Sequence, residues 1–294
     1  MSSLQPHYQT PRSTKVSSVT LPTPAHWLAI IFLIPAFRYL YLDYRKYIAL
    51  GPGGTPSTFS GYVRVKILGL FALSNPYEPP SVPLYTTRKE GRLSNLPKRR
   101  GPRPTTVGIA PHRQVDQRTP PALFEILSAA IRTIASRNNR VELGTSCFEK
   151  HGPGLFSINP LRRTCRGEIC HAHPSDGSLH LTLHPADAKV MLEAGWGERH
   201  PLARGGWLER FVPGGFVMLY APRIEEEIEV VLSIIQAAAW WVSGEDVIAL
   251  DAIRRDSGIN DTHVIDTEIV DLTKDCSNNL SIVGGGTRAV SVVY

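Results

Sequence analysis

Histidine is concentrated in one short part of this chain. Five of the ten histidines fall between residues 171 and 200, at positions 171, 173, 180, 184 and 200. Imidazole titrates near neutral pH, binds transition metals, and both donates and accepts hydrogen bonds. Such a cluster therefore indicates a chemical site, although a single buried histidine is usually structural and that alternative stays open for each ring.

The spacing of these histidines predicts how they meet. His171 and His173 alternate along one expected strand, so their side chains share a face with Ile169, while Glu168 points to the other face. A hairpin turn then returns the chain, and the second strand of the hairpin brings His180 alongside the first pair.

Two kinds of chemistry fit this arrangement. His171, His173 and His180 are candidate metal ligands, because two imidazoles at alternate positions and a third on the neighbouring strand form a triad, to which Asp176 or Glu168 would add a carboxylate. The other interpretation makes the same rings general acid or base groups that take a proton from an acidic enol or phenol. The sequence leaves both open.

The segment Gly195–Ala203 extends the candidate site. Two glycines flank Trp196 and predict a tight loop that presents the indole ring. Arg199 and His200 follow with a fixed cation and a titratable base, so the loop suits a planar, anionic ligand. The structural alternative is a buried tryptophan beside a surface arginine.

The elements around these residues predict an α+β fold. Proline, glycine and apolar spacing place helices at residues 121–134, 185–194 and 224–242, with His184 capping the second. Strands are expected at 141–149, 168–173, 179–183 and 216–220. Without βαβ alternation, the sheet should be mainly antiparallel, with helices packed on it.

An apolar N-terminal segment predicts one membrane helix before this domain. Residues 27–42 are almost wholly apolar, and Arg38 and the tyrosines at the end of the run suit an interface. A buried soluble helix or a signal sequence would look similar, but no small-residue cleavage site follows. We expect a disordered leader at 1–25, an anchor at 26–44, and membrane lipids as partners.

The remaining chain divides by composition. We expect residues 45–118 to form a linker and a basic, proline-rich arm, in which 61–73 is a helix or a strand. Between residues 88 and 118 there are nine Lys/Arg residues and only two acidic residues. No zinc-finger, helix-turn-helix or RNA-binding pattern accompanies this charge, so nucleic acid is not an expected partner. The catalytic domain is expected at 119–244 and a tail at 245–294.

Cysteine usage bears on the compartment. The four cysteines, at 147, 165, 170 and 276, show no paired spacing, which favours free thiols in a reducing compartment. We therefore expect a single-pass protein of the endoplasmic reticulum with its catalytic domain in the cytosol. Use of the glycosylation sequons at Asn260 and Asn279 would argue for the opposite orientation.

Several motifs carry a family resemblance. They are Glu168-Ile-Cys-His-Ala-His173, Leu179-His-Leu181, Gly195-Trp-Gly-Glu-Arg-His-Pro-Leu-Ala203 and Tyr220-Ala-Pro-Arg-Ile-Glu-Glu-Glu227, preceded by Asp43-Tyr44, Gly51-Pro52 and Phe59-Ser-Gly-Tyr62. In these segments the chain resembles the fungal luciferase family over roughly residues 40 to 242.

The resemblance implies a membrane-associated enzyme that oxidises 3-hydroxyhispidin, a styryl-pyrone, with molecular oxygen as co-substrate and no organic cofactor. The implied course is deprotonation, reaction with oxygen, a cyclic peroxide and loss of carbon dioxide. On this basis the expected catalytic residues are His171, His173, His180, His200 and Arg199. The expected substrate-binding residues are Trp196, Glu168, Tyr220 and Arg223.

Other functions remain in view. Residues 74–118 and 203–216 differ from luminous members of the family, so a relative acting on another hydroxypyrone or polyketide of fungal secondary metabolism fits as well. A cofactor-free cyclase or isomerase would use the same pocket without oxygen. A non-catalytic membrane-associated binding protein would need only the anchor and the basic arm.

Overall fold

The computed structural model describes residues 23–82, 88–162, 164–244 and 246. Most of the expected leader and nearly all of the expected tail lie outside these residues, as do Cys276 and the two sequons. The described chain is an α+β protein, as the sequence predicts.

A six-stranded antiparallel sheet forms the centre of the protein, in the order β3-β4-β5-β6-β8-β7. Its strands are β3 (Val141–Thr145), β4 (Pro153–Ser157), β5 (Glu168–Ala172), β6 (Leu179–Thr182), β7 (Gly197–Arg199) and β8 (Phe216–Leu219). The predicted hairpin of β5 and β6 is confirmed, with His171 directly opposite His180. The sequence did not predict β4 or β7.

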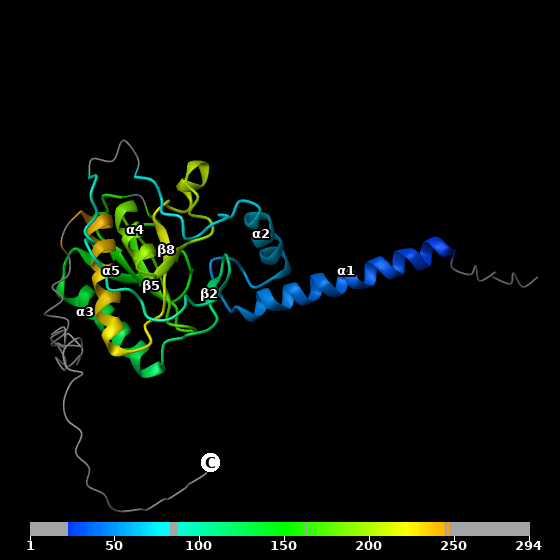
Figure 1. Ribbon diagram of the computed structural model, residues 1–294, viewed down its shortest axis with the longest axis horizontal. Helices are drawn as coiled ribbons and strands as arrows, with labels where there is room; N and C mark the ends of the chain where they lie inside the picture. The colour runs from blue at the N-terminus through cyan, green and yellow to red at the C-terminus, as the bar shows by residue number, and fades with distance from the viewer. Residues whose placement is uncertain (1–22, 83–87, 163, 245, 247–294) are drawn as a thin grey trace, which may run out of the picture. The chain divides into compact units, whose positions relative to one another are not determined.

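Helices cover one face of this sheet. They are α3 (Pro121–Arg137), α4 (Pro185–Glu193) and α5 (Glu225–Ser243), and all three predicted helices are thereby confirmed. Leu179 and Leu181 of β6 join α5 in one apolar core on this side. The three helices lie near the labelled strands of the sheet in Figure 1. His184 is the N-cap of α4, where its Nδ1 accepts the Ala186 N–H at 3.1 Å, as expected.

The opposite face of the sheet is polar and lies against a small hairpin. Strands β1 (Thr106–Gly108) and β2 (His112–Gln114) pair antiparallel within the expected basic arm. His112 of β2 contacts His180 of β6, so the arm covers the polar face. Strand β2 is labelled beside the sheet in Figure 1. The chain before residue 119 is therefore part of the structure that builds the site.

A bulge at the start of β5 changes which residues share the polar face. Phe156 pairs with Glu168 and Leu155 with Cys170, so Ile169 is the extra residue. Because a bulge shifts the alternation by one residue, Glu168 lies on the same side as His171 and Ile169 joins the apolar core. The sequence predicted that Ile169 shares the face of His171 and that Glu168 lies on the other face. Because of the bulge, this prediction is wrong for both residues.

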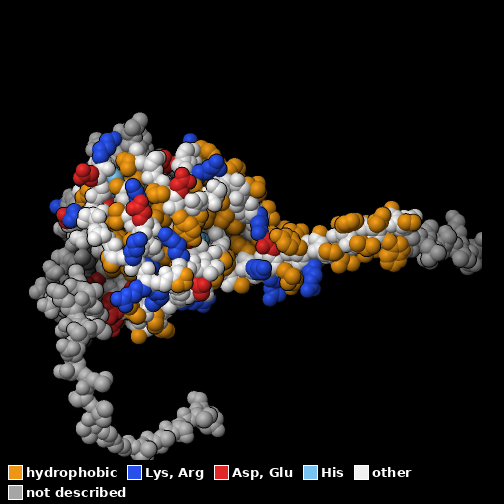
Figure 2. All heavy atoms as spheres, in the orientation of Figure 1, with side chains coloured by type: hydrophobic (Ala, Val, Ile, Leu, Met, Phe, Trp, Pro, Cys, Tyr) orange, Lys and Arg blue, Asp and Glu red, His pale blue; other side chains and the backbone are white. Residues whose placement is uncertain are grey.

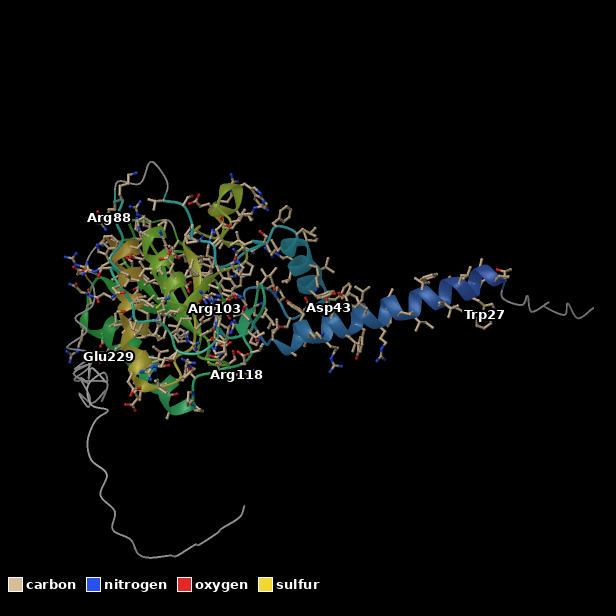
Figure 3. All side chains as sticks on the ribbon, in the orientation of Figure 1. Trp27, Asp43, Arg88, Arg103, Arg118 and Glu229 are labelled. Carbon is tan, nitrogen blue, oxygen red and sulfur yellow. A yellow bond between two sulfur atoms is a disulfide. The ribbon has the colours of Figure 1, made fainter. Side chains whose placement is uncertain are left out.

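The N-terminal helix α1 (Pro24–Ala49) is long and apolar enough to cross a membrane, since 26 residues span about 39 Å. Figure 3 labels Trp27 near its start and Asp43 in its C-terminal part. Its hydrophobic side chains are exposed from Trp27 to Leu42, as Figure 2 shows. A signal sequence would pass the same test.

The end of α1 packs on a second helix and on the β1–β2 turn. Helix α2 (Phe59–Gly69) settles the choice between helix and strand for this segment. Tyr47, Tyr62 and Val65 form a small cluster against Ile109 and Ala110 of the turn. The first helix is thereby attached to the hairpin that carries His112.

One disulfide corrects the expectation of free thiols. Cys147 and Cys165 are bonded to each other, while Cys170 is a free, buried thiol in the apolar core. The two bonded residues lie 18 positions apart, too far for the short motifs on which the prediction was based. Cys147 belongs to the turn after β3, which also contains Glu149.

Candidate active site

Five buried histidines meet on the polar face of the sheet. Neighbouring ring centroids lie 4.7–5.4 Å apart. The five are His112 of β2, His171 of β5, His173 just after β5, His180 of β6 and His200 just after β7. The structure therefore brings together all four predicted catalytic histidines and adds His112.

Three of the rings form a continuous row between two glutamates. His112 Nε2 lies 3.2 Å from Glu198 Oε1, and His112 Nδ1 lies 3.2 Å from His180 Nε2. His180 Nδ1 is 3.3 Å from His171 Nε2, and His171 Nδ1 is 2.6 Å from Glu168 Oε1. Hydrogen bonds connected in this way fix the orientation of every ring in the row.

His173 and Glu149 flank this row. His173 Nδ1 lies 2.9 Å from Ser178 Oγ, which itself donates to Asp176 Oδ1 at 2.6 Å. His173 Nε2 is buried without a hydrogen-bond partner among the described residues, and Glu149 Oε1 is 3.6 Å away. Arg113 of β2 holds the Glu149 carboxylate through two hydrogen bonds, at 3.1 and 2.6 Å.

Burial keeps most of this cluster neutral. It lowers the pKa of His173 to about 4. Burial, and then neighbouring imidazoles, also lower the pKa values of His180 and His200 well below their usual range. Burial would raise the pKa of Glu149, but the Arg113 hydrogen bonds together with the electrostatic influence of His173, Arg113 and His171 outweigh it, and the net shift of the pKa is downward. Near neutral pH, the site therefore combines neutral rings with an ionised carboxylate.

Two sets of side chains within the described residues have ligand atoms close enough to hold a metal ion. Glu149, His171, His173 and His180 form one set, and His112, His180 and His200 form the other; within each set the ligand atoms lie within 4.8 Å of one another. The predicted triad belongs to the first set. Its carboxylate is Glu149 and not Glu168 or Asp176, since those two hold the outer nitrogen of His171 and the Ser178 hydroxyl.

His200 is held by the backbone. Its Nδ1 accepts the Leu202 N–H at 3.1 Å and its Nε2 lies 3.0 Å from the Ile109 carbonyl oxygen. Both ring nitrogens are thus occupied, so His200 links the β7 edge to the β1–β2 turn.

The other predicted residues of the Gly195–Ala203 loop lie apart from the imidazoles. Trp196 is buried in the apolar core on the helix side, and its indole N–H donates to the Pro97 carbonyl at 2.6 Å. Arg199 pairs in the sheet with Val217, whose side chain also belongs to that core, so the register places Arg199 on the face opposite the histidines. Its guanidinium donates to the carbonyl oxygens of Glu78 and Ala203.

The three remaining candidates support neighbours. Glu168 accepts hydrogen bonds from Ser146 Oγ at 2.7 Å and from the Cys147 N–H at 2.7 Å, besides its contact with His171. The Tyr220 hydroxyl donates to Glu198 Oε2 at 2.9 Å. Arg223 pairs with Glu227 at the start of α5, away from the imidazoles.

A cavity of about 920 Å³ lies at the end of β6 and the start of β8. Its walls include Arg199, Arg204, Thr182 and Leu183, so it reaches side chains from both faces of the sheet. Thr182 is on the same face as His180, about 7 Å along the strand, and Phe216 stacks on His180 with ring centroids 5.2 Å apart. The cavity therefore ends close to the cluster.

Sequence reasoning missed three residues of the site. His112 lies in a segment without regular spacing, and Glu198 lies in the loop whose tryptophan was the predicted ligand contact. Glu149 was predicted as the last residue of a strand at 141–149, but β3 ends at Thr145 and Glu149 belongs to the turn that follows. A signal existed for one of them: Glu198 and His200 alternate around Arg199, as on a strand, and β7 ends at Arg199.

The fold and this site define an α+β protein with a buried imidazole–carboxylate centre and an N-terminal apolar helix. The Luciferase domain family model matches residues 166–238, which contain β5, β6 and most of α5. Luciferases from Armillaria gallica and Armillaria ostoyae are each 35% identical to this chain over 233 residues, covering 71% of this chain and 84% of each relative. The luciferase of Neonothopanus nambi is 35% identical over 235 residues.

These similarities show that the chain belongs to the fungal luciferase family. No solved structure matches it.

Proposed function

We propose that the protein is a membrane-anchored oxygenase that oxidises a small enolic or phenolic compound, such as a hydroxypyrone, with molecular oxygen. The observation that carries this proposal is the buried cluster of five imidazoles in a chain of the luciferase family. Burying polar rings is unfavourable unless they are hydrogen-bonded, and clustered groups with shifted pKa values are typical of active sites.

The geometry supports a proton-accepting role for the cluster. An acidic enol must lose its proton before oxygen can accept electrons from it, and a neutral imidazole is a suitable base. Burial keeps His173, His180 and His200 neutral near pH 7. A proton taken up at His180 has a hydrogen-bonded route through His112 to Glu198.

The cavity at the strand ends supports the binding of an oxygen-rich substrate. Arg199 and Arg204 contribute positive charge to its wall. Arg199 Nε and Thr182 Oγ1 are both buried without a hydrogen-bond partner in the part of the chain that the structure describes. These unsatisfied groups would gain partners from the oxygens of a bound enolate.

Oxygen consumption tests the proposal directly. Full-length protein purified in detergent is given 3-hydroxyhispidin and simpler hydroxypyrones, and oxygen uptake, carbon dioxide release and light are measured. We expect substrate-dependent oxygen uptake in the wild type and its loss in His180→Asn. Product formation under strict anaerobiosis would instead identify a cyclase or isomerase, and no turnover of any pyrone would overturn the substrate class.

We further propose that α1 anchors the protein in the endoplasmic reticulum membrane with the catalytic unit in the lumen. The disulfide between Cys147 and Cys165 favours this side, because disulfides persist in oxidising compartments. This reverses the orientation expected from the sequence. Glycosidase treatment should increase the mobility of the cell-derived protein through loss of glycans at Asn260 or Asn279, while complete digestion by external protease in intact microsomes would contradict a luminal domain.

A further inference from the structure

The strongest unexplained feature of the site is the arrangement of nitrogens around Glu149. His171 Nε2 and His173 Nε2 lie 4.0 and 3.6 Å from Glu149 Oε1. These separations are too long for hydrogen bonds. They are close to the spacing of ligands on one ion, since two atoms bound about 2.1 Å from a metal at tetrahedral angles are about 3.4 Å apart.

In both rings the nitrogen that points away from Glu149, here called the outer nitrogen, has a hydrogen-bond partner of its own. His171 Nδ1 contacts the Glu168 carboxylate at 2.6 Å, and His173 Nδ1 contacts the Ser178 hydroxyl at 2.9 Å. Both Glu168 oxygens accept hydrogen bonds, from Ser146 Oγ and from the Cys147 N–H, so the carboxylate serves as an acceptor and favours the tautomer of His171 with its proton on Nδ1. Metal-binding histidines are typically oriented in this way by a carboxylate or hydroxyl behind the ring.

Hydrogen-bond donors are too few to satisfy the row of rings. Glu198 and Glu168 each require an N–H from the ring beside them, so His112 Nδ1 and His171 Nε2 are left as acceptors. His180 lies between these two acceptors, at 3.2 and 3.3 Å. A neutral imidazole has one N–H and can satisfy only one of them, so one contact brings two lone pairs together.

A cation at the inner nitrogens removes this conflict. If His171 Nε2, His173 Nε2 and His180 Nδ1 turn lone pairs toward an ion, each ring needs one N–H, on its outer nitrogen. Those protons then go to Glu168, Ser178 and His112, and His112 donates to Glu198. Every ring in the cluster that contacts the ion is then neutral and fully hydrogen-bonded.

We propose that Glu149, His171, His173 and His180 bind one divalent transition-metal ion. Three imidazoles and one carboxylate favour first-row ions such as Mn²⁺, Fe²⁺, Co²⁺ or Zn²⁺ over Mg²⁺ or Ca²⁺, which prefer oxygen ligands. The Arg113 guanidinium orients the Glu149 carboxylate, and Glu168 and Ser178 orient the two β5-side rings. The binding of the ion stands on this geometry alone, whereas any part it takes in oxygen chemistry rests on the proposed function.

Metal content and Co²⁺ spectroscopy test the site. Tag-free full-length protein in detergent is stripped with a chelator, dialysed and titrated with Mn²⁺, Fe²⁺ (anaerobically), Co²⁺ and Zn²⁺ separately. We expect one equivalent of at least one ion by elemental analysis, visible absorption bands from bound Co²⁺, and a higher Tm for the loaded protein. Binding of none of these ions by the wild type would overturn the proposal.

Matched variants locate the ion. Glu149→Gln keeps the size of the side chain and should weaken binding at least tenfold, and His173→Ala should lower it below a tenth of an equivalent. His184→Asn is the control, because His184 is equally buried but caps α4 outside the cluster, and it should bind like the wild type. Full binding by the folded Glu149→Gln variant, judged by circular dichroism, or equal loss in the control, would place the ion elsewhere.

The result separates this proposal from the proposed function. Oxygen uptake by stripped protein at the wild-type rate, without metal binding, would leave the oxygenase standing and remove the metal site. One bound ion without turnover of any pyrone would leave the metal site standing and remove the substrate class.

Discussion

The two faces of the central sheet differ completely, although the same strands build both. In β6, Leu179 and Leu181 enter the apolar core against α5, while His180 and Thr182 point to the opposite side. The helix face is filled by apolar side chains that pack together and need no hydrogen-bond partners. The polar face is filled by rings and carboxylates that each need a specific partner.

This difference separates stability from chemistry within one strand. Each fully buried leucine on the helix face contributes roughly 2–5 kcal/mol to the free energy of unfolding. Buried polar groups such as His180 contribute little net stability even when hydrogen-bonded. Neighbouring residues of β6 should therefore respond in opposite ways to substitution.

The largest effect is expected at the centre of the polar face. His180→Leu replaces a ring with an apolar side chain of similar size, so we expect kcat/KM to fall at least about 100-fold, as for removal of a proton-transfer group. The free energy of unfolding should fall by about 1–3 kcal/mol, because the nitrogens of His112 and His171 that face His180 lose their partner. Oxygen uptake and urea denaturation measure the two quantities. If His180→Leu instead lost most of its stability while its folded fraction kept full activity, His180 would serve stability and not chemistry.

The neighbouring residue should behave in the opposite way. Leu181→Ala leaves a cavity against α5 and should lower the free energy of unfolding by about 2–5 kcal/mol. Activity per folded molecule should remain near that of the wild type at low temperature. Denaturation curves with matched activity assays check this, and a fall in kcat/KM as large as that of His180→Leu would show that the two faces are not independent.

The disulfide tests how the polar face is held together. The Cys147→Ser, Cys165→Ser double variant should lose about 3 kcal/mol, because the bond closes a loop of similar length to those for which this is typical. The same turn positions Glu149 and the Glu168 partners, so affinity for Co²⁺ should also fall. Cys170→Ala is the control, since it keeps the bond, and a reductant should still destabilise it. Unchanged stability in the double variant would mean that the bond is not formed in solution.

The smallest effect concerns a carboxylate on the helix side. Burial raises the pKa of Asp187 in α4 to about 6, and no cation pairs with it in the described chain. A raised pKa means that the protonated form is preferred in the fold, so its stabilising contribution is complete below about pH 4 and is lost as the pH rises through 6. Asp187→Asn should therefore gain about 2 kcal/mol over the wild type at pH 7.5 and little at pH 4. Denaturation at both pH values measures the difference, and equal effects at the two would refute it.

The helices and the His171–His180 hairpin could be predicted because local spacing determines them. Alternation in β5 and β6, the turn between them, and the glycine after α5 are properties of short segments. Glu168 could not be placed correctly, because a bulge depends on the pairing with β4 and leaves no local pattern.

The residues that contact the β5–β6 hairpin from other segments could not be predicted either. His112 and Arg113 belong to β2, and the packing of the β1–β2 hairpin brings them to the site from a distant part of the sequence. Glu149 comes from the turn after β3, inside the segment predicted as a continuous strand. The glycines beside Trp196 indicate a tight backbone, but they do not indicate the side of the sheet to which the indole ring turns. The structure places that ring in the apolar core and not beside the imidazoles. In a sheet with one polar face, local spacing thus predicts which strand residues lie on that face. It does not predict which residues from other segments contact them.

The attachment of α1 to the β1–β2 turn affects how a soluble form of the protein should be made. Thr55 donates to the Ala110 carbonyl and also contacts the Tyr47 hydroxyl at 2.9 Å, so the last two turns of α1 hold the turn next to His112. Truncation just before Asp43 would remove the exposed apolar part of the helix and keep this support. Truncation near residue 119, the start expected for the catalytic domain, would discard His112 and Arg113, and the product would lack part of the site.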